Sequence, residues 1–135
     1  MCAVRIARPS VEYDAVVAFY RDLLRFAIIA TFAEHDGYAG TVFGLPDRRF
    51  QLEITRHRGG HPQPSPTEED LLVVYFEDEA SRIEVEKRLE QSDVAPASLE
   101  NPYWARIGAR GFRDPDGWLV VLARAVRPVA GSASE

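Results

Sequence analysis

The pattern of apolar and polar positions predicts the same series of elements twice along the chain. In the first half, a helix is expected at 13–24, where apolar side chains recur three to four residues apart. Runs of strand length with alternating or continuous apolar residues lie on both sides of it, at 3–7, 25–32, 37–45 and 48–55. The first half is therefore predicted to fold as βαβββ.

The second half follows the same order. A continuous apolar run at 71–76 predicts a strand, and a helix is expected over 77–93. This helix begins with acidic residues, which suit the positive end of a helix dipole, and its apolar stripe is thinner than that of the first helix. Three more strands are expected at 94–99, 105–112 and 117–124.

Two similar turns support a duplication. The sequence Asp-Pro-Asp-Gly at 114–117 fixes φ at its proline and leaves Gly117 free, so it predicts a turn before the last strand. A weaker copy, FGLPD at 43–47, stands about half a chain length earlier, with matching Phe, Pro and Asp. A repeat of this kind decides the fold before any single element does.

The fold class that follows is α+β, one domain of two tandem βαβββ modules. The expected boundaries are 3–56 for module one, 57–69 for a Gly/Pro-rich linker, 70–125 for module two and 126–135 for a small, polar, flexible tail. Each sheet would carry its helix on the outer face, and the free faces would curve around a shared central groove. The groove is where function is expected.

The length and net charge of the chain limit the kinds of partner it can be expected to bind. The 135 residues suit one domain, and 16 Lys and Arg against 21 Asp and Glu give a net charge of −5. No basic block is present, so nucleic acid and anionic membranes are disfavoured, and a small-molecule ligand is expected instead. No apolar run has the length of a signal or a membrane span, which predicts a cytoplasmic protein. The lone Cys2 cannot form an internal disulfide.

Three motifs carry a resemblance to a known superfamily: AFYRDLL at 18–24, QLEIT at 51–55 and FRDPDGWLVVL at 112–122. Together with the repeat, they resemble the vicinal oxygen chelate superfamily of glyoxalase I, extradiol dioxygenases, fosfomycin-resistance enzymes and bleomycin-binding resistance proteins. The resemblance covers nearly the whole chain. Shorter stretches, HDGYAG, FGLP and ENPYW, are similar to an uncharacterised glyoxalase-like bacterial branch, which implies the fold and not the activity.

The resemblance implies a divalent metal held by one residue from the first and fourth strand of each module. Those positions fall on Ala3, Glu53, Leu71 and Val121, of which only Glu53 can bind a metal. A transition metal needs about three or four protein ligands to compete with water. A shift of the alignment would replace Ala3 by Arg5, which is no ligand either. No cofactor is therefore expected, and a divalent metal is disfavoured.

Strand alternation sets the predicted groove. Arg5, Gln51 and Glu53 would line one wall, which is polar, with Tyr75 and Val121 on an apolar wall opposite. Such walls suit a partly apolar organic molecule. Two interpretations of the charged residues stay open. In the first, Arg5 and Glu53 form an ion pair that neutralises two half-buried charges. In the second, Arg5 fixes an anionic group of a ligand, while Glu53 accepts a hydrogen bond or acts as general base.

The remaining aromatic residues and histidines leave alternatives open. Tyr103 and Trp104 follow the rigid turn Asn101-Pro102 and either stack on a ring ligand or pack in the core. His57 and His61 lie in the expected linker, where a solvated loop is favoured over a metal site because a third ligand is lacking. His35 is expected in a surface turn.

Two functions are compatible with these features. The leading one is a protein that binds a small organic molecule and sequesters it, as the resemblance to bleomycin-resistance proteins implies. The alternative is a glyoxalase-like lyase or isomerase that uses Glu53 as base or as part of an unrecognised metal site, so catalysis stays open. A groove that serves only as a dimer interface is a third alternative. Exposed edge strands and the resemblance together imply a homodimer.

Overall fold

The computed structural model describes residues 1–125, and the expected flexible tail lies outside the described residues. The chain forms two compact units. The first unit consists of Met1–Ser65 with Asp114–Gly117, and the second takes up Pro66–Arg113 and the chain from Trp118 onward. The turn at Asp114–Gly117 therefore belongs to the first unit, although the chain on both sides of it belongs to the second.

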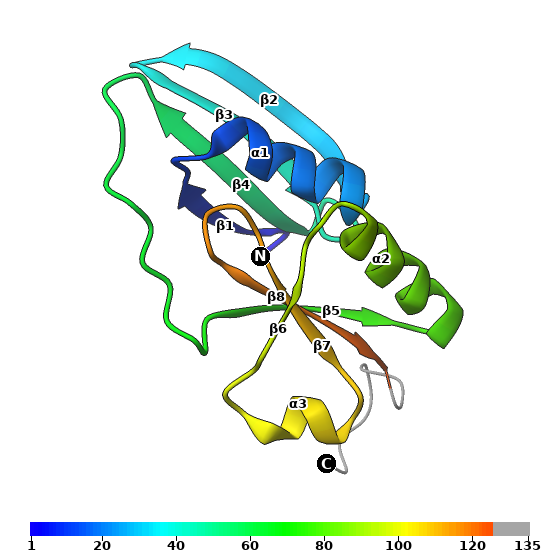
Figure 1. Cartoon of the computed structure of the whole chain (residues 1–135). Coiled ribbons are helices and arrows are strands. Elements are labelled where there is room, and N and C mark those ends of the chain that lie inside the picture. The colour runs from blue at the N-terminus through cyan, green and yellow to red at the C-terminus, as the bar shows by residue number, and fades with distance from the viewer. Residues whose placement is uncertain (126–135) are drawn as a thin grey trace. The chain divides into compact units, whose positions relative to one another are not determined.

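The first unit has the predicted βαβββ order. Its elements are β1 (Val4–Pro9), α1 (Tyr13–Ala18), a π-helical turn η1 (Phe19–Leu23), β2 (Ala27–His35), β3 (Tyr38–Gly44) and β4 (Phe50–His57). The strands form one mixed sheet in the order β1-β4-β3-β2, with β1 parallel to β4 and the other pairs antiparallel. Helix α1 lies across one face of this sheet (Figure 1).

The core of the first unit follows from the periodicity of its elements. Leu52 and Ile54 alternate along β4 with less buried polar residues and are each 1% exposed. Val16 and Tyr20, one helical turn apart, are buried with them. The alternation leaves the opposite face of β4 to polar side chains, which is where the candidate site lies.

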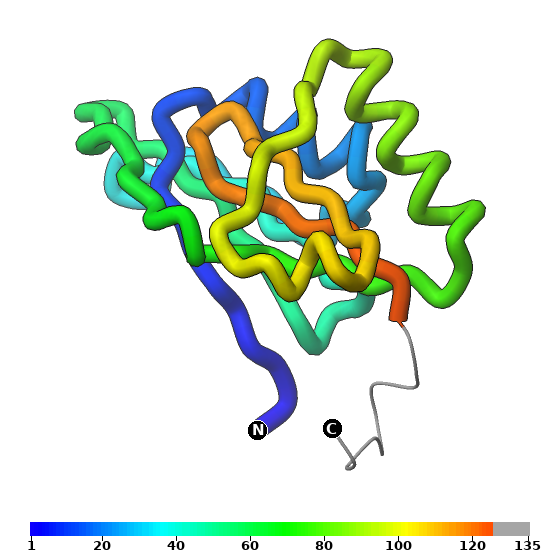
Figure 2. The backbone as a smooth tube through the Cα atoms, turned by 60° about the horizontal axis from the view of Figure 1, so that its bottom comes forward, coloured from blue at the N-terminus to red at the C-terminus, as the bar shows by residue number. Residues whose placement is uncertain are grey.

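The second unit repeats the sheet. Its elements are β5 (Leu71–Phe76), α2 (Glu79–Gln91), β6 (Pro96–Ala97), α3 (Pro102–Arg106), β7 (Arg110–Arg113) and β8 (Leu119–Arg124). The strand order is β5-β8-β7-β6, again with the first strand parallel to the last. Strands β7 and β8 run side by side in the tube view (Figure 2). The tandem α+β architecture predicted from the sequence is confirmed.

One part of the second unit differs from the prediction. The strands expected at 94–99 and 105–112 are short, and helix α3 stands between them. The Asn101 side chain accepts a hydrogen bond of 2.9 Å from the Tyr103 amide and caps this helix, and Pro102 occupies its first turn, where a missing N–H costs nothing. Gly108, at φ +74°, ends it. Asn101-Pro102 is therefore a helix start and not an isolated turn.

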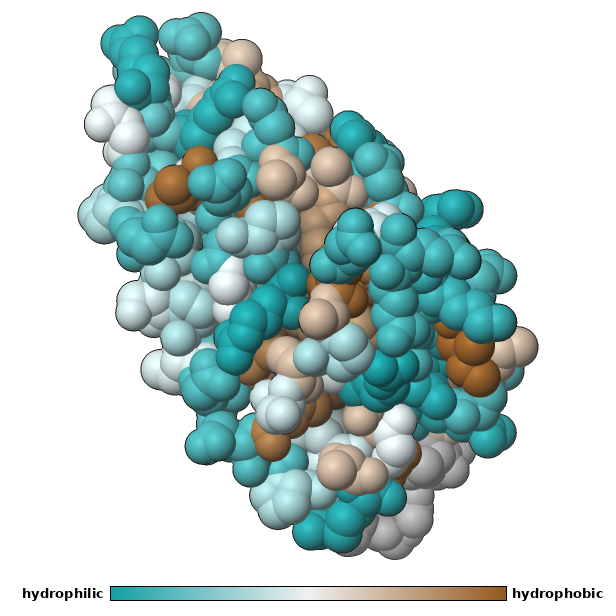
Figure 3. Space-filling view, in the orientation of Figure 1, coloured by the Kyte–Doolittle hydropathy of each residue, from teal (hydrophilic) through white to brown (hydrophobic). Residues whose placement is uncertain are grey.

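Helix α2 has charged residues on its buried side, which explains its thin apolar stripe. Arg82 and Glu86 are 9% and 5% exposed and lie among the buried Val85 and Leu89. Asp78 caps the helix by accepting a 2.7 Å hydrogen bond from the Ser81 amide. The outward face of α2 is mostly hydrophilic (Figure 3). Within residues 1–125 no helix is long and apolar enough to cross a membrane.

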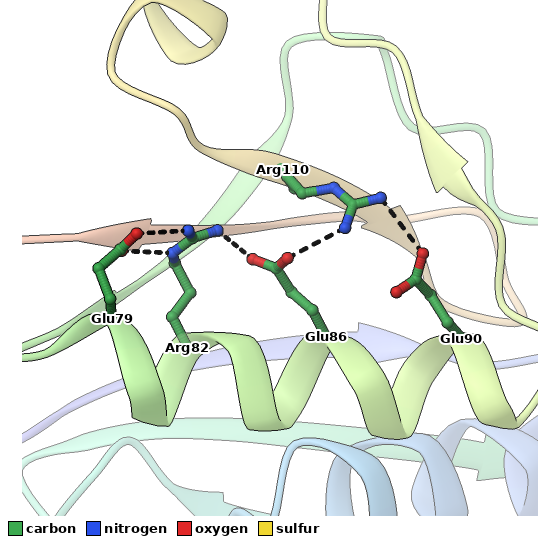
Figure 4. Close-up of polar contacts among 5 residues, drawn as sticks. All are labelled: Glu79, Arg82, Glu86, Glu90 and Arg110. Carbon is green, nitrogen blue, oxygen red and sulfur yellow. Dashed lines mark hydrogen bonds and ion pairs between the residues drawn. The ribbon is translucent and has the colours of Figure 1, made fainter.

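The buried charges of α2 belong to a network of five side chains (Figure 4). Arg82 donates to both oxygens of Glu79, at 2.9 and 2.8 Å, and also to Glu86. Arg110, on β7, donates to the other oxygen of Glu86 at 3.0 Å and to Glu90 at 3.4 Å. Alternating charges thus join α2 to β7.

The turn at Asp114–Gly117 is held by buried carboxylates. Asp114 and Asp116 are 4% and 6% exposed. The Asp116 carboxylate accepts hydrogen bonds from Ser10 Oγ at 2.6 Å and from the amides of Val11 at 3.3 Å and Glu12 at 3.0 Å. These donors lie in the connection from β1 to α1. The sequence predicted the turn but not this use of its side chains.

Asp114 closes the turn and holds the π-helical turn η1 through Tyr20. Its side chain accepts hydrogen bonds from the Asp116 amide at 2.9 Å and from Tyr20 Oη at 2.6 Å, and Gly117 supplies the required positive φ of 96°. The copy in the first half does not reproduce this arrangement. There Asp47 is exposed and accepts a hydrogen bond from the Arg49 amide at 2.8 Å.

Tyr20 predicts a pH dependence of stability. Burial, and then the charge and hydrogen bond of Asp114, raise the pKa of Tyr20 well above its ordinary value of 10.0. Below that value tyrosine is neutral in both the folded and the unfolded chain, so it causes no pH dependence. Above it only the unfolded chain releases the proton, and the free energy of unfolding falls as pH rises.

We expect Tyr20→Phe to flatten this alkaline fall, measured by urea unfolding at several pH values between about 8 and 11. At neutral pH the variant should be less stable by about 1 kcal/mol, because it loses the hydrogen bond to Asp114. Tyr103→Phe is the matched control, since Tyr103 is 41% exposed. Equal slopes in the two variants would contradict the assignment.

Candidate functional site

Three of the predicted site residues form a polar row on the sheet of the first unit. Arg5 of β1 is paired in register with Gln51 of β4, and Ala7 is paired with Glu53, so the three polar side chains lie on one face. Arg5 Nε donates a 2.8 Å hydrogen bond to Gln51 Oε1, and Arg5 Nη1 lies 3.5 Å from Glu53 Oε1. Gln51 Nε2 donates to the Arg48 carbonyl oxygen at 2.8 Å, which fixes the amide.

The ion pair in this row is weak. The Arg5 side chain is 47% exposed and the Glu53 side chain 13% exposed. A contact of 3.5 Å with a half-exposed guanidinium contributes little to stability. Among the described residues, Arg5 Nη2 donates no hydrogen bond and Glu53 Oε2 accepts none. A donor and an acceptor thus stand next to each other with capacity left for a ligand.

The other predicted site residues lie in the second unit. Tyr75 of β5 is 48% exposed, and Val121 of the adjacent β8 is wholly buried. Tyr103 and Trp104 lie on α3 and not in the loop expected from the sequence, with ring centroids 5.1 Å apart in an edge-to-face contact. The correction follows from the Asn101 cap, which starts a helix where a turn was expected.

The residues at the positions of the expected metal ligands do not fit a metal. Glu53 alone carries a suitable oxygen, and Ala3, Leu71 and Val121 offer hydrocarbon. In the part of the chain that the structure describes, no three His, Cys, Asp or Glu side chains gather as a metal site. The metal content of the protein stays a prediction.

Histidines that the sequence placed in a solvated linker are in contact with other rings. Strand β4 extends to His57, which is opposite Tyr38 in the β3–β4 register, and their ring centroids are 4.5 Å apart. His61 lies 6.2 Å from Tyr38 and 6.4 Å from His57. The longer strand explains the difference, because pairing with Tyr38 brings the start of the linker onto the sheet.

The two tandem units place the protein in a class. A pair of βαβββ units, each with a mixed sheet in the same strand order, defines a protein of the vicinal oxygen chelate superfamily, which includes glyoxalases and the fosfomycin and bleomycin resistance proteins. Within this class the chain belongs to the YycE-like family, whose N-terminal domain matches residues 4–55 and whose C-terminal domain matches residues 69–124.

Relatives in Bacillus subtilis agree with this assignment. The uncharacterised protein YycE of strain 168 is 36% identical over 119 residues, which cover 88% of this chain and 85% of that protein. A crystal structure of a B. subtilis YycE protein of unknown function, a candidate glyoxalase/fosfomycin resistance protein, has a TM-score of 0.89 at 34% identity. It covers 96% of this chain and 93% of its own.

More distant structures share the fold alone. The trypanothione-dependent glyoxalase I of Leishmania major has a TM-score of 0.67 at 16% identity, over 89% of this chain and 84% of its own. TnmS3, an antibiotic binding protein from Streptomyces sp. CB03234, has a TM-score of 0.64 at 19% identity, over 90% and 93%. The fold thus occurs in an enzyme and in a binding protein.

Proposed function

We propose that the chain binds a small, partly apolar organic molecule through Arg5, Gln51 and Glu53, without a tightly held metal, and acts by sequestering it. The observation that carries this proposal is the hydrogen-bonded row of these three side chains, in which Arg5 and Glu53 keep a donor and an acceptor for a ligand. The row also needs little rearrangement on binding, because Gln51 is fixed to the Arg48 carbonyl.

The row indicates what the ligand offers. Arg5 would donate to a carbonyl or carboxylate oxygen of the ligand, and Glu53 would accept from a hydroxyl or amide N–H beside it. Because the Glu53 side chain is 13% exposed, a hydrogen bond made there competes with little water. Hydroxy acids and primary amides carry this pair of groups. The existence of an antibiotic binding protein with the same fold supports binding as a function of this architecture.

The test combines a ligand screen with one substitution. Thermal unfolding is measured against a panel of hydroxy acids, primary amides and aromatic antibiotics, and the dissociation constant of each hit is then compared in Glu53→Gln. We expect hits whose affinity falls about tenfold or more in the variant, the usual effect of losing a hydrogen bond to a charged group. Glu84→Gln is the control, because the Glu84 side chain is 71% exposed on α2.

Other results would contradict the proposal. Metal analysis of the purified protein should find no stoichiometric transition metal; one metal per chain that Glu53→Gln removes would favour the glyoxalase-like lyase or isomerase. Hits unaffected by Glu53→Gln would remove the row as a binding site. A panel without hits would favour a groove that serves only as a dimer interface.

The proposal includes a homodimer in the cytoplasm, with no nucleic acid or membrane as partner. Apolar side chains on the first unit support a second copy as partner. Val4, Ile6 and Phe50 are 45%, 52% and 56% exposed, and Val4 is paired in register with Phe50 at the edge strand β1. An exposed edge with apolar side chains favours association with another chain.

A further inference from the structure

A cavity of about 290 Å³ lies within the first unit, away from the polar row. It is found where β1 and β4 end and α1 begins, and Figure 1 shows these three points on the same side of the unit. Its lining includes Ser10, Tyr13, Asp14, Arg56, His57 and His61. None of these residues belongs to the row of Arg5, Gln51 and Glu53, so a ligand in the cavity would bind independently of the function proposed above.

One residue of the lining, His61, has a buried polar atom without a partner. His61 Nε2 is inaccessible to solvent and makes no hydrogen bond to any described residue. Buried polar atoms in folded proteins are nearly always hydrogen-bonded, and an unsatisfied one costs free energy. An imidazole nitrogen can carry a proton and donate it to an acceptor. A rotation of the imidazole that turns Nε2 toward the cavity would let a ligand oxygen satisfy it.

The second group with unused capacity is the Arg56 guanidinium. It lies 4.7 Å above the centre of the Tyr13 ring, which holds it in place by a cation–π contact. Tyr13 is fixed in turn by a hydrogen bond of 2.6 Å between its hydroxyl and Thr41 Oγ1. The carboxylate of Asp14 is 3.8 Å from Arg56 Nη1, too far for a hydrogen bond, and the Asp14 side chain is 91% exposed. Arg56 thus presents oriented N–H groups without an acceptor among residues 1–125.

Two other polar groups of the lining already have partners. Ser10 Oγ donates to Asp116 at 2.6 Å, and His57 Nδ1 accepts a 3.0 Å hydrogen bond from the Gly59 amide. Arg56 and His61 can both donate, and Asp14, the acidic residue of the lining, has its side chain 91% exposed. A cation would find only the exposed carboxylate of Asp14, whereas an oxyanion would find a guanidinium and an imidazole.

We propose that this cavity binds the carboxylate or phosphoryl group of a small molecule between the Arg56 guanidinium and His61 Nε2. Arg56 supplies the charge and its planar fork of N–H groups, which matches two oxygens of either group. His61 supplies the third contact from the buried side. The site takes an anion at the end of the sheet and leaves the row of Arg5, Gln51 and Glu53 free for its own ligand.

The test follows the imidazole signals of the full chain by NMR. Protein labelled with ¹⁵N is titrated with sodium phosphate, and separately with sodium acetate, at fixed pH and with ionic strength kept constant by sodium chloride. We expect the His61 signal to shift and saturate with at least one probe, and the probe that binds more tightly identifies the group as phosphoryl or carboxylate. His35, which lies outside the cavity lining, should not shift.

Two arginine variants decide whether the cavity is responsible. Arg56→Gln should weaken binding about tenfold or more, because it removes the charge and most of the donors. Arg58→Gln is the matched control: Arg58 is two residues along the chain, its side chain is 73% exposed and it is paired with Glu34. Shifts that grow without saturation, or an equal loss of affinity in both variants, would overturn the proposal. Unchanged affinity in Arg56→Gln would overturn it as well.

Discussion

Replacing Asp116 with alanine is expected to lower the free energy of unfolding by about 3 kcal/mol. The Asp116 carboxylate is buried and accepts three hydrogen bonds, from Ser10 Oγ and from the amides of Val11 and Glu12. Alanine leaves the buried Ser10 hydroxyl and the two partly buried amides with no acceptor, and such losses cost about 1 kcal/mol each. Urea unfolding followed by circular dichroism measures the change.

Two controls separate the carboxylate from the turn itself. Asp116→Asn keeps the shape and one acceptor oxygen, so its loss should be about half that of Asp116→Ala or less. Asp47→Ala changes the matching position of the first-half turn, where the side chain is 58% exposed, and should stay within about 0.5 kcal/mol of the parent. An equally large loss in Asp47→Ala would show that the turn, and not the buried hydrogen bonds, determines the stability.

The repeat could be predicted from the sequence because short local patterns, the turns and the apolar runs, recur in both halves. Phe43 and Phe112 occupy matching positions of the two similar turns, and both are 0% exposed. The strands at the centre of each sheet, such as β4 and β8, follow from apolar alternation or from a continuous apolar run. Duplication then gives the topology, since two similar sequences of this length fold into the same supersecondary unit.

Features that depend on contacts between residues far apart in the chain could not be predicted from the sequence. The turn chemistry of Asp114 and Asp116 is local, but their hydrogen bonds reach Tyr20 and Ser10 about a hundred residues away. The contact of Tyr38 with His57 depends in the same way on the strand register, which extends β4 into the expected linker. Local composition gives no sign of such partners.

The candidate site was predicted in part. Strand alternation placed Gln51 and Glu53 on one face, and the parallel register with β1 brings Arg5 beside them. Tyr103 and Trp104 were placed in a loop because an Asn-Pro pair signals both a turn and a helix start. Only the hydrogen bond from the Tyr103 amide to the Asn101 side chain distinguishes the two.

Glu86→Ala is the second substitution with a large expected effect, a loss of about 2 to 3 kcal/mol in the free energy of unfolding. The Glu86 side chain is 6% exposed and bonds to both Arg82 and Arg110 (Figure 4). Removing it leaves the Arg82 side chain, 11% exposed, with Glu79 as its remaining partner in the network. A buried charge that loses one of two partners is costly, although Glu79 limits the loss. Thermal and urea unfolding measure the effect.

A double substitution distinguishes the value of the network from the cost of breaking it. Arg82→Met with Glu86→Leu removes both buried charges and fills the same space with hydrocarbon, so we expect stability close to that of the parent or slightly above it. Glu84→Ala should cost little, because the Glu84 side chain is 71% exposed and its contact with Arg88 is a 3.6 Å ion pair within the same helix. If the double variant is as unstable as Glu86→Ala, the oriented hydrogen bonds between α2 and β7 stabilise the second unit in a way that apolar packing cannot replace. Recovery of stability would instead show that the buried charges of α2 join it to β7 without making the unit more stable than an apolar contact would.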